Sequence, residues 1–169
     1  TDVHYNASVY KDLQGNVLGV FAAARDVTNQ KKTEAKFRGF LESAPDGVVV
    51  VDASGKMVLV NAKTENLFGY KRHEMLGKKV EMLMPQHFQN RHVKHRDGFS
   101  TNPEARGMGS GVELYGRRKD GSEFPIEISL SPLETEAGVL VSSSIRDVTL
   151  QKQASRYVRS LLEASLDPL

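Results

Sequence analysis

The feature that most constrains this chain is a segment that occurs twice. "RDVTNQKKTEAKFRGFLESAPDG" begins at Arg25, and "RDVTLQKQASRYVRSLLEASLDP" begins at Arg146, at an offset of 146 − 25 = 121 residues. The same offset places Asp46 on Asp167. A fixed period is typical of tandem modules, and this one has the size of a small domain. We therefore expect the end of one module, a complete second module and the start of a third, taken from a longer protein.

The repeat also extends toward the N-terminus, where the residues from Val3 align with those from Phe124. Residues 3–10 and 17–27 alternate or run apolar around "KDLQGN", whose Gly15 and Asn16 suit a hairpin turn. The sequence thus predicts that residues 1–28 form the C-terminal hairpin of an upstream module. A linker helix follows at 29–44, with Thr28 as its expected N-cap.

The composition excludes several classes of chemistry. Cysteine is absent, which removes disulfides, thiolate zinc sites and cysteinyl adducts or nucleophiles. The net charge of +2 is too small to indicate a nucleic-acid partner, and the apolar runs are only as long as strands. We expect a cytoplasmic location and no membrane contact in this part of the protein.

The complete module combines strands and helices in a fixed order. "GVVVVDASGKMVLVN" predicts a strand, a turn and a second strand, after which Asn61 caps the helix "AKTENLFGY". Short helical turns lead to a longer helix near 86–99, and "ARGMGSG" predicts a flexible crossing. The period then becomes two, with an Asp-Gly turn in "RKDGSE" that we expect to be a solvated hairpin tip. This order predicts an α+β domain with helices over one face of an antiparallel sheet.

These segments resemble a PAS domain. The resemblance lies in "FLESAPDGVVVVDASGKMVLVNAKTENLFGY", "MLGKKVEMLMP", "GRRKDGSEFPIEISLSPL" and "SIRDVT", and covers residues 37–149. It implies a five-stranded antiparallel sheet with a ligand pocket under the helices. The organisation would be an upstream hairpin at 1–28, a linker helix at 29–44, a complete PAS domain at 45–149, and a C-terminal linker helix with the start of a third module at 150–169.

The resemblance also implies a function in signalling rather than catalysis. Such domains lie in bacterial histidine kinases, cyclic-dinucleotide enzymes and chemoreceptors, where they sense a ligand or mediate dimerisation. The expected partners are a second copy of the chain, adjacent PAS modules and an output domain in the same chain. Asp147 and Thr149 are the expected signal relay into the last helix; simple capping of that helix is the alternative.

The last helix also predicts a contact with a second copy. Leu150, Ala154, Tyr157 and Leu161 follow the 4-3-4 spacing of a coiled-coil seam. An amphipathic helix packed on its own domain would show the same pattern. The helix after Thr28 is expected to join the dimer seam through three apolar side chains, Phe37, Phe40 and Leu41.

One cluster, "MPQHFQNRHVKHRDGF", carries a candidate cofactor site. His92 and His95 share a helix face, and neutral imidazole is a common ligand of haem iron. In oxygen-sensing haem PAS kinases, which this segment resembles, a histidine eight residues after the Met of "MP" binds the iron, and that position is His92. The arginine that contacts gas in those sensors would fall near Val112, in an apolar run. A solvated basic face is the alternative for this helix.

Other cofactors and an enzymatic function are disfavoured. A zinc site would use His92, His95 and Asp97 and would have no fourth ligand. A hydrolytic relay of Ser100, His95 and Asp97 would lie along a single helix without an oxyanion hole. The flavin classes of PAS domain that this chain could resemble need a cysteine or commonly use a tryptophan, and it has neither.

The expected pocket lining consists of apolar side chains from the helices and the inner face of the sheet, for which plain core packing is the alternative. The residues are Leu67, Phe68, Met75, Leu76, Met82, Leu83, Phe88, Leu114, Ile126, Ile128 and Val141.

Overall fold

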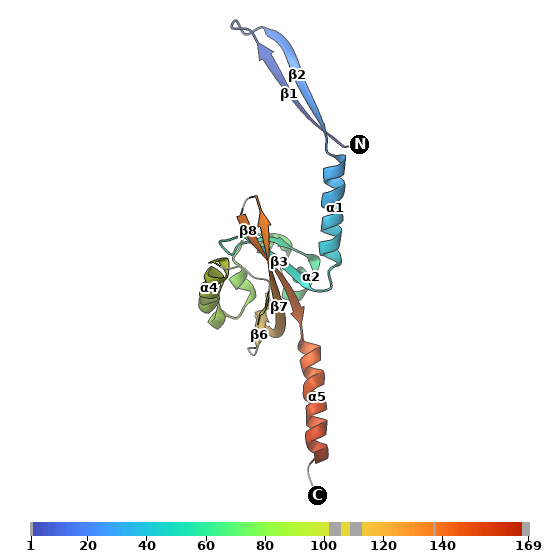
Figure 1. Cartoon of the computed structure of the whole chain (residues 1–169), viewed down its shortest axis with the longest axis vertical. Helices are drawn as coiled ribbons and strands as arrows, with labels where there is room; N and C mark the ends of the chain where they lie inside the picture. Colours follow the sequence, from blue (N-terminus) through green and yellow to red (C-terminus); the bar gives the residue numbers. More distant parts are fainter. Residues whose placement is uncertain (1, 102–105, 109–112, 137, 167–169) are drawn as a thin grey trace. The chain divides into compact units, whose positions relative to one another are not determined.

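The structure, a computed structural model, describes residues 2–101, 106–108, 113–136 and 138–166. The chain divides into two units, Thr1–Ser43 and Ala44–Leu169. The first unit contains two strands and a helix: β1 (Val3–Lys11), β2 (Val17–Asp26) and α1 (Thr28–Ser43) (Figure 1). The strands form an antiparallel hairpin in which Val3 pairs with Asp26 and Val9 with Val20.

The second unit contains the mixed pattern of strands and helices that the sequence predicts. Its elements are β3 (Gly47–Val51), β4 (Met57–Val60), α2 (Ala62–Phe68), α3 (Arg72–Met75), the 3-10 turn η1 (Val80–Leu83), α4 (Gln86–Thr101), β5 (Arg106–Met108), β6 (Leu114–Arg117), β7 (Glu123–Thr135), β8 (Gly138–Asp147) and α5 (Thr149–Leu166). Within these described residues no helix has both the length and the apolar content that a bilayer crossing needs.

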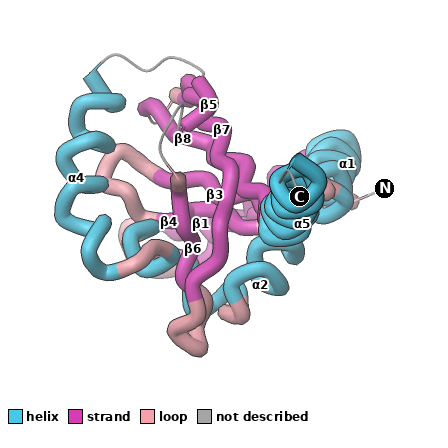
Figure 2. Tube along the Cα trace, turned by 90° about the horizontal axis from the view of Figure 1, so that it is seen from below, coloured by secondary structure: helices cyan, strands magenta, loops and turns pink. Residues whose placement is uncertain are grey.

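The strands of the second unit form one antiparallel sheet in the order β4-β3-β8-β7-β5. β6 also pairs with β7, further along the same edge: β5 lies opposite residues 128–130 and β6 opposite residues 123–126. The predicted α+β fold with a five-stranded antiparallel sheet is therefore confirmed, with one edge position shared by two short strands. The prediction for "ARGMGSG" was wrong at Arg106–Met108, because these residues pair with β7 as a strand. Figure 2 shows the sheet as one layer with α4 along one side.

Side-chain alternation along β7 determines which face of the sheet holds the core. Phe124 and Ile126 are buried, whereas Glu123, Glu127 and Ser129 are exposed. A strand turns successive side chains to opposite faces, so one face becomes continuously apolar. That face packs against the helices in a core of Val49, Val51, Met57, Val60, Leu67, Phe68, Met75, Leu83, Phe124, Ile126 and Ile145.

Helix α2 starts where the sequence predicts and ends at Phe68, two residues before the predicted end. The Asn61 side chain accepts a hydrogen bond from the Thr64 amide and so caps the N-terminus. At the other end Gly69 has φ 76°, and its amide donates to the carbonyl of Glu65. This left-handed conformation is readily available to glycine, so the helix ends there without strain.

Candidate functional site

The joint between β8 and α5 is the first candidate site. The Asp147 carboxylate accepts hydrogen bonds from the Thr149 amide at 2.9 Å and from the Thr149 hydroxyl at 2.5 Å. The aspartate lies directly before Val148, whose carbonyl accepts the first hydrogen bond of the helix from the Lys152 amide. Its side chain therefore caps the first turn of the helix, and Thr149 acts as the donor. The same applies to α1, where Asp26 accepts from the Thr28 amide at 2.9 Å.

The Asp147 carboxylate also forms an ion pair with Arg118, at 3.1 Å from its guanidinium. Partial burial acts to raise the pKa of the Asp147 carboxyl. The hydrogen bonds from Thr149 and Arg118 outweigh this effect, so the pKa lies below its ordinary value of 3.8. The carboxylate is therefore charged at neutral pH and holds both partners.

Arg118 connects the joint to the rest of the domain. Its guanidinium donates to the carbonyl of Leu67, in the last turn of α2, and lies 3.7 Å from the centroid of the Phe124 ring. One side chain thus contacts a helix end, a core aromatic ring and the capping aspartate. Such cation–π contacts orient a guanidinium over the ring face.

The tip of the turn, residues 119–122, is exposed, as expected for a solvated hairpin tip, but Arg118 just before it is half-buried and contacts α2. The Lys119 amide donates to the carbonyl of Phe68 at 2.9 Å, and its ammonium lies 2.6 Å from the Glu74 carboxylate. These contacts fix the β6–β7 turn against the ends of α2 and α3.

The first turn of α5 has a second tether. Lys152 pairs with Glu113, just before β6, at 2.6 Å. The Val148 amide donates to the carbonyl of Pro125 at 3.1 Å, which anchors the backbone of the joint to β7. The start of α5 is therefore attached to both β6 and β7.

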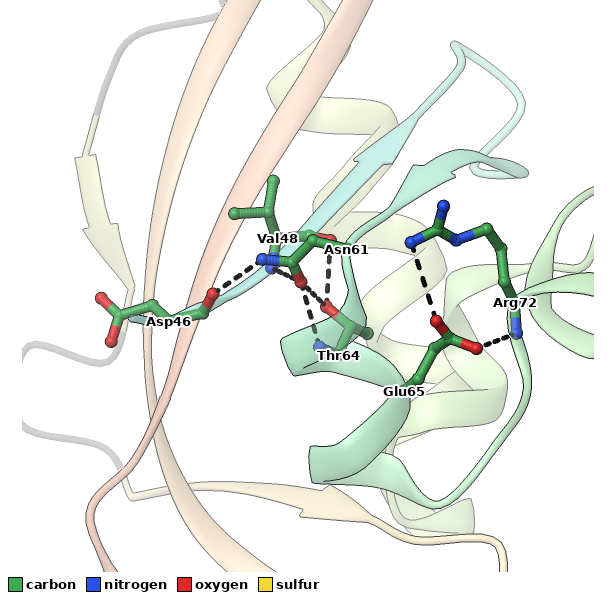
Figure 3. A network of polar contacts seen from close by, with 6 residues as sticks. All are labelled: Asp46, Val48, Asn61, Thr64, Glu65 and Arg72. Carbon is green, nitrogen blue, oxygen red and sulfur yellow. Dashed lines mark hydrogen bonds and ion pairs between the residues drawn. The ribbon is translucent and has the colours of Figure 1, made fainter. Parts of the chain in front are cut away.

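A buried polar network connects the beginning of the domain to the cap of α2 (Figure 3). The Asn61 carboxamide oxygen accepts from the Val48 amide at 2.9 Å, and its nitrogen donates to the carbonyl of Asp46 at 3.0 Å. The Thr64 hydroxyl lies 2.8 Å from the Asn61 oxygen. Asn61 thus satisfies groups of β3 and of the segment before it, as well as those of its own helix.

A second polar contact lies beside this network: Glu65 accepts a hydrogen bond from the Arg72 amide at 2.8 Å and pairs with the Arg72 guanidinium at 3.6 Å.

A third cluster holds α4 against η1. One oxygen of Glu81, a residue that is only 8% exposed, lies 3.0 Å from Nδ1 of His92 and 2.6 Å from the Arg96 guanidinium. Among the described residues, no group of three or more potential ligands could hold a metal ion. The side chains of His95, Asp97 and Ser100, which the zinc and hydrolytic hypotheses need, lie outside the part that the structure describes.

Comparison with known proteins identifies the fold. The family model that describes the PAS fold matches residues 35–148. This chain belongs to the PAS family. The PAS domain of an HTR-like protein from Haloarcula marismortui superposes with a TM-score of 0.61 at 25% identity, over 70% of this chain and 94% of that one. An RNA-binding light-oxygen-voltage receptor gives 0.64 over 96% of this chain and 44% of that one; at 18% identity this shows the fold alone.

Three curated PAS relatives are signalling proteins. Sensor protein FixL of Bradyrhizobium diazoefficiens is 25% identical over 94% of this chain and 33% of its own length. Oxygen sensor protein DosP of Escherichia coli is 28% identical over 73% of this chain and 16% of its own. The cell-division control histidine kinase PdhS of Brucella ovis is 30% identical over 70% and 11%. The chain therefore spans a third or less of the length of these relatives.

Most of the apolar residues expected to line a pocket in the PAS domain lie together in the core. Five of them belong to the buried cluster: Leu67, Phe68, Met75, Leu83 and Ile126. Four others pack against it: Met82, Leu114, Ile128 and Val141. Leu76 is 39% exposed, and Phe88 is half-buried beside His87. Leu76 thus does not fit the expected lining, and a role in ligand binding for the others stays a prediction.

The expected seam residues of α5 lie on its surface. Leu150 is 80% exposed, and Tyr157, Leu161 and Ala154 are exposed as well. On α1, Phe37 and Phe40 are exposed and Leu41 is half-buried.

Sequence reasoning missed the two residues that organise the sites around the joint and α4. Arg118 was read as part of a solvated basic run, and Glu81 was not singled out. A charged residue between apolar neighbours in "VEMLMP" was the available signal for Glu81. For Arg118 no local signal existed, because its partners Leu67 and Asp147 are 51 and 29 residues away in the chain.

Proposed function

We propose that residues 45–149 form a sensory and dimerisation PAS domain that passes its signal through α5 to a downstream output domain. The observation that carries this proposal is the double engagement of Asp147, which caps α5 and also binds Arg118. A helix whose first turn depends on a contact to the domain body changes its stability when that contact changes.

The route of the signal follows the contacts of Arg118. A ligand or a change in packing under the helices would shift the end of α2, where the Leu67 carbonyl accepts from Arg118. Arg118 would then alter its pairing with Asp147, and the first turn of α5 would loosen or tighten. This mechanism needs a two-state response in one side chain rather than a movement of the whole sheet.

Dimerisation is proposed to use the apolar stripe of α5, which is the predicted seam together with its exposed apolar neighbours. Val158 and Leu162 are exposed beside the predicted seam of Leu150, Tyr157 and Leu161, which widens the stripe. An exposed stripe of this kind is normally covered by a partner helix. A parallel pair of α5 helices, joined by α1 through Phe37, Phe40 and Leu41, would transmit repacking to whatever follows.

The domain is proposed to be non-catalytic itself and to act within a larger cytoplasmic signalling protein. PdhS is named a histidine kinase and FixL and DosP are named sensors, which supports a sensor kinase as the parent. A cyclic-dinucleotide enzyme, which the resemblance to PAS domains also implies, is the alternative parent. The segment at 1–28 would then be the last hairpin of an adjacent PAS module, and residues 29–44 and 150–169 would be the linkers.

The test is self-association of the chain, measured by sedimentation velocity. Replacing Tyr157 and Leu161 by Glu puts charge in the stripe and should shift the population to the monomer. A matched control is Arg159→Glu, because helical spacing places Arg159 on the opposite face of α5. An unchanged mass in the double variant would reject the dimer seam.

A haem-binding gas or redox sensor is the second candidate. The contact between His92 Nδ1 and Glu81 favours it, because metal-binding histidines commonly engage a carboxylate through their other ring nitrogen. DosP is named an oxygen sensor. Phe68, Met75 and Leu83 oppose it, since they are packed in the core where a macrocycle would need space. His92 would be the iron ligand, and bound iron would supply gas binding or electron transfer. A Soret band after incubation with haem, absent in His92→Ala, would establish this function, and a colourless protein would reject it.

A further inference from the structure

The start of the PAS domain is clamped to the end of its last strand by an ion pair. The Asp46 carboxylate accepts two hydrogen bonds from Arg146, at 3.0 Å from Nε and 2.9 Å from a terminal nitrogen. The two residues are 100 positions apart in the chain. A bidentate pair of this kind fixes orientation as well as distance.

Asp46 is a meeting point of three parts of the domain. Its carbonyl accepts from the Asn61 carboxamide, which caps α2, and its carboxylate accepts a further bond from the Ser144 hydroxyl at 3.3 Å. In Figure 3 the backbone of Asp46 lies beside Asn61, and its carboxylate points away from it. Asp46 is also the third residue after α1, which ends at Ser43. The end of the linker helix and Asp46 are therefore separated by only two residues of the chain.

Arg146 directly precedes Asp147, the cap of α5. Consecutive residues of a strand point to opposite faces of the sheet. At the end of β8, Arg146 therefore binds Asp46 at the start of the domain, and the next residue, Asp147, binds the first turn of α5.

Both members of the pair recur in the internal repeat. Arg25 occupies the position of Arg146, and Asp167 occupies that of Asp46, at the same offset. Ten of the 23 aligned positions that start at Arg25 and Arg146 are identical, so the recurrence of both partners is part of the wider similarity between the modules. It is consistent with the same pair forming in each module.

We propose that Asp46 and Arg146 form a coupling clamp that transmits a displacement of the upstream linker to the N-terminal cap of α5. The clamp rests on the proposed relay through Asp147, but it adds a second input that does not require a ligand in the domain. A PAS module with this clamp has two inputs to α5. The clamp transmits the state of the preceding module, and Arg118 transmits a change inside the module itself. In a tandem array, Arg25 would bind the equivalent aspartate of the module before, and Asp167 would bind the equivalent arginine of the module after.

The electrostatics agree with a persistent clamp. The Asp46 side chain is 20% exposed, whereas that of Arg146 is 59% exposed. The hydrogen bonds from Arg146 lower the pKa of the Asp46 carboxyl, and partial burial acts against this effect without cancelling it. The carboxylate is therefore ionised over the whole neutral range and keeps its partner.

The experiment is hydrogen–deuterium exchange of the 169-residue chain, followed by mass spectrometry of peptides that cover residues 41–48 and 147–153. The single variants are Asp46→Asn and Arg146→Ala, and the double variant combines them. Lys63→Ala is the matched control, because Lys63 lowers the pKa of the Asp46 carboxyl through its charge alone. Peptides from β3 report on global stability.

We expect Asp46→Asn to raise exchange in both peptides by about fivefold, the size expected for a partly exposed charge-assisted pair. In the Arg146→Ala background Asp46→Asn should add nothing to exchange at 147–153, because the path would already be broken. The charge-reversed pair, Asp46→Arg with Arg146→Asp, should restore part of the protection. Lys63→Ala should leave both peptides unchanged.

Two outcomes would overturn the clamp. Exchange that rises only at 41–48 would show that Asp46 does not act on α5, and additive effects in the double variant would show that Arg146 is not the path. Asp147→Asn, measured in parallel, separates this result from failure of the relay. If that variant exposes the first turn of α5 while Asp46→Asn does not, the relay stands and the clamp is rejected; if it has no effect, the relay fails.

Discussion

The hairpins β1–β2 and β7–β8 occupy equivalent positions in the internal repeat, but their side chains have different surroundings. Tyr5, which is 72% exposed, corresponds to Ile126, which is 8% exposed and lies in the core. Val20 is exposed, whereas its counterpart Val141 packs against the core. In the described residues β1 and β2 form a two-stranded sheet, while β7 and β8 lie inside a larger one.

The register of the two hairpins also differs, but each side chain stays on the same face of its hairpin. Tyr5 pairs with Ala24, whereas Ile126 pairs with Asp147, the counterpart of Asp26. The shift is therefore two residues, and because side chains alternate with period two, each strand keeps the same face. The comparison teaches that the repeated sequence specifies the face of a hairpin, while neighbouring strands and helices decide whether that face is buried.

The joints after the two hairpins are more alike than the hairpins. Both aspartates accept a hydrogen bond from the threonine amide two residues later at 2.9 Å. Lysine in the first turn pairs with an acidic residue in each, Lys31 with Asp2 at 3.6 Å and Lys152 with Glu113 at 2.6 Å. The hydrogen bond from the threonine amide to the aspartate joins residues two positions apart, so it depends on sequence neighbours and does not need the rest of the domain.

The largest expected effect contrasts equivalent core and surface positions. Ile126→Ala should lower the free energy of unfolding of the second unit by about 2–5 kcal/mol, because it leaves a cavity in a packed core. Tyr5→Ala should change stability by less than about 0.5 kcal/mol, as surface substitutions do. Urea denaturation measures both, and a comparable loss in Tyr5→Ala would show that the first hairpin is covered.

The next effect contrasts two glycines that lie close to aromatic rings. A Cβ at Gly116 would lie 2.9 Å from the Phe124 ring and 3.0 Å from the Phe68 ring. Gly116→Ala should therefore cost about 1–3 kcal/mol through overpacking. A Cβ at Gly19 would lie 2.7 Å from Tyr10, but the Tyr10 ring is exposed and can turn away. Gly19→Ala should be neutral or slightly stabilising in the same denaturation experiment, and equal losses would contradict this view.

A smaller effect separates the two joints. Asp147→Ala removes a helix cap and an ion pair together, and should cost about 1–2 kcal/mol in the free energy of unfolding. Asp26→Ala removes the cap of α1 alone and should only fray its first turn. Amide exchange at residues 28–32 and 149–153 locates each change. If Asp147→Ala affected only the first turn of α5 and left the free energy of unfolding unchanged, Arg118 would not connect the cap to the domain.

The smallest effect is the response to acid. Hydrogen bonds from the Thr28 side chain and amide lower the pKa of the Asp26 carboxyl, and the pKa of the Asp147 carboxyl is also lowered. A carboxyl whose pKa is lower in the folded state than its ordinary value of 3.8 stabilises the folded state at pH values above 3.8. This stabilisation is lost as the pH falls through the pKa of the folded state. Both first turns should therefore fray below about pH 3.8 in NMR titrations. In Asp147→Asn, α5 should lose this dependence while α1 keeps it.

Local patterns predicted much of this protein. Alternation along 123–131 predicted the buried face of β7, and Asn61 predicted the start of α2. The strand at Arg106–Met108 was missed because a short glycine-containing segment carries no periodicity, and only pairing with β7 makes it a strand. The same limit applies to the sites: the proposed role of Asp147 was visible in the repeat, but its partner Arg118 was not.

The sequence by itself determined the repeat and the family, because these follow from comparing segments of the chain. It also determined most of the strands and helices and the cap of α2, because these depend on residues within a few positions of each other. The tertiary structure decided which charges meet. Arg146 reaches Asp46 and Arg118 reaches Leu67 only because sheet pairing brings distant segments together. Glu81 is buried against Arg96 because α4 packs against η1, which is again a contact that only the folded chain makes. Charged side chains on a strand or turn have no periodic signature of their partner, so their roles follow from the register of the folded sheet.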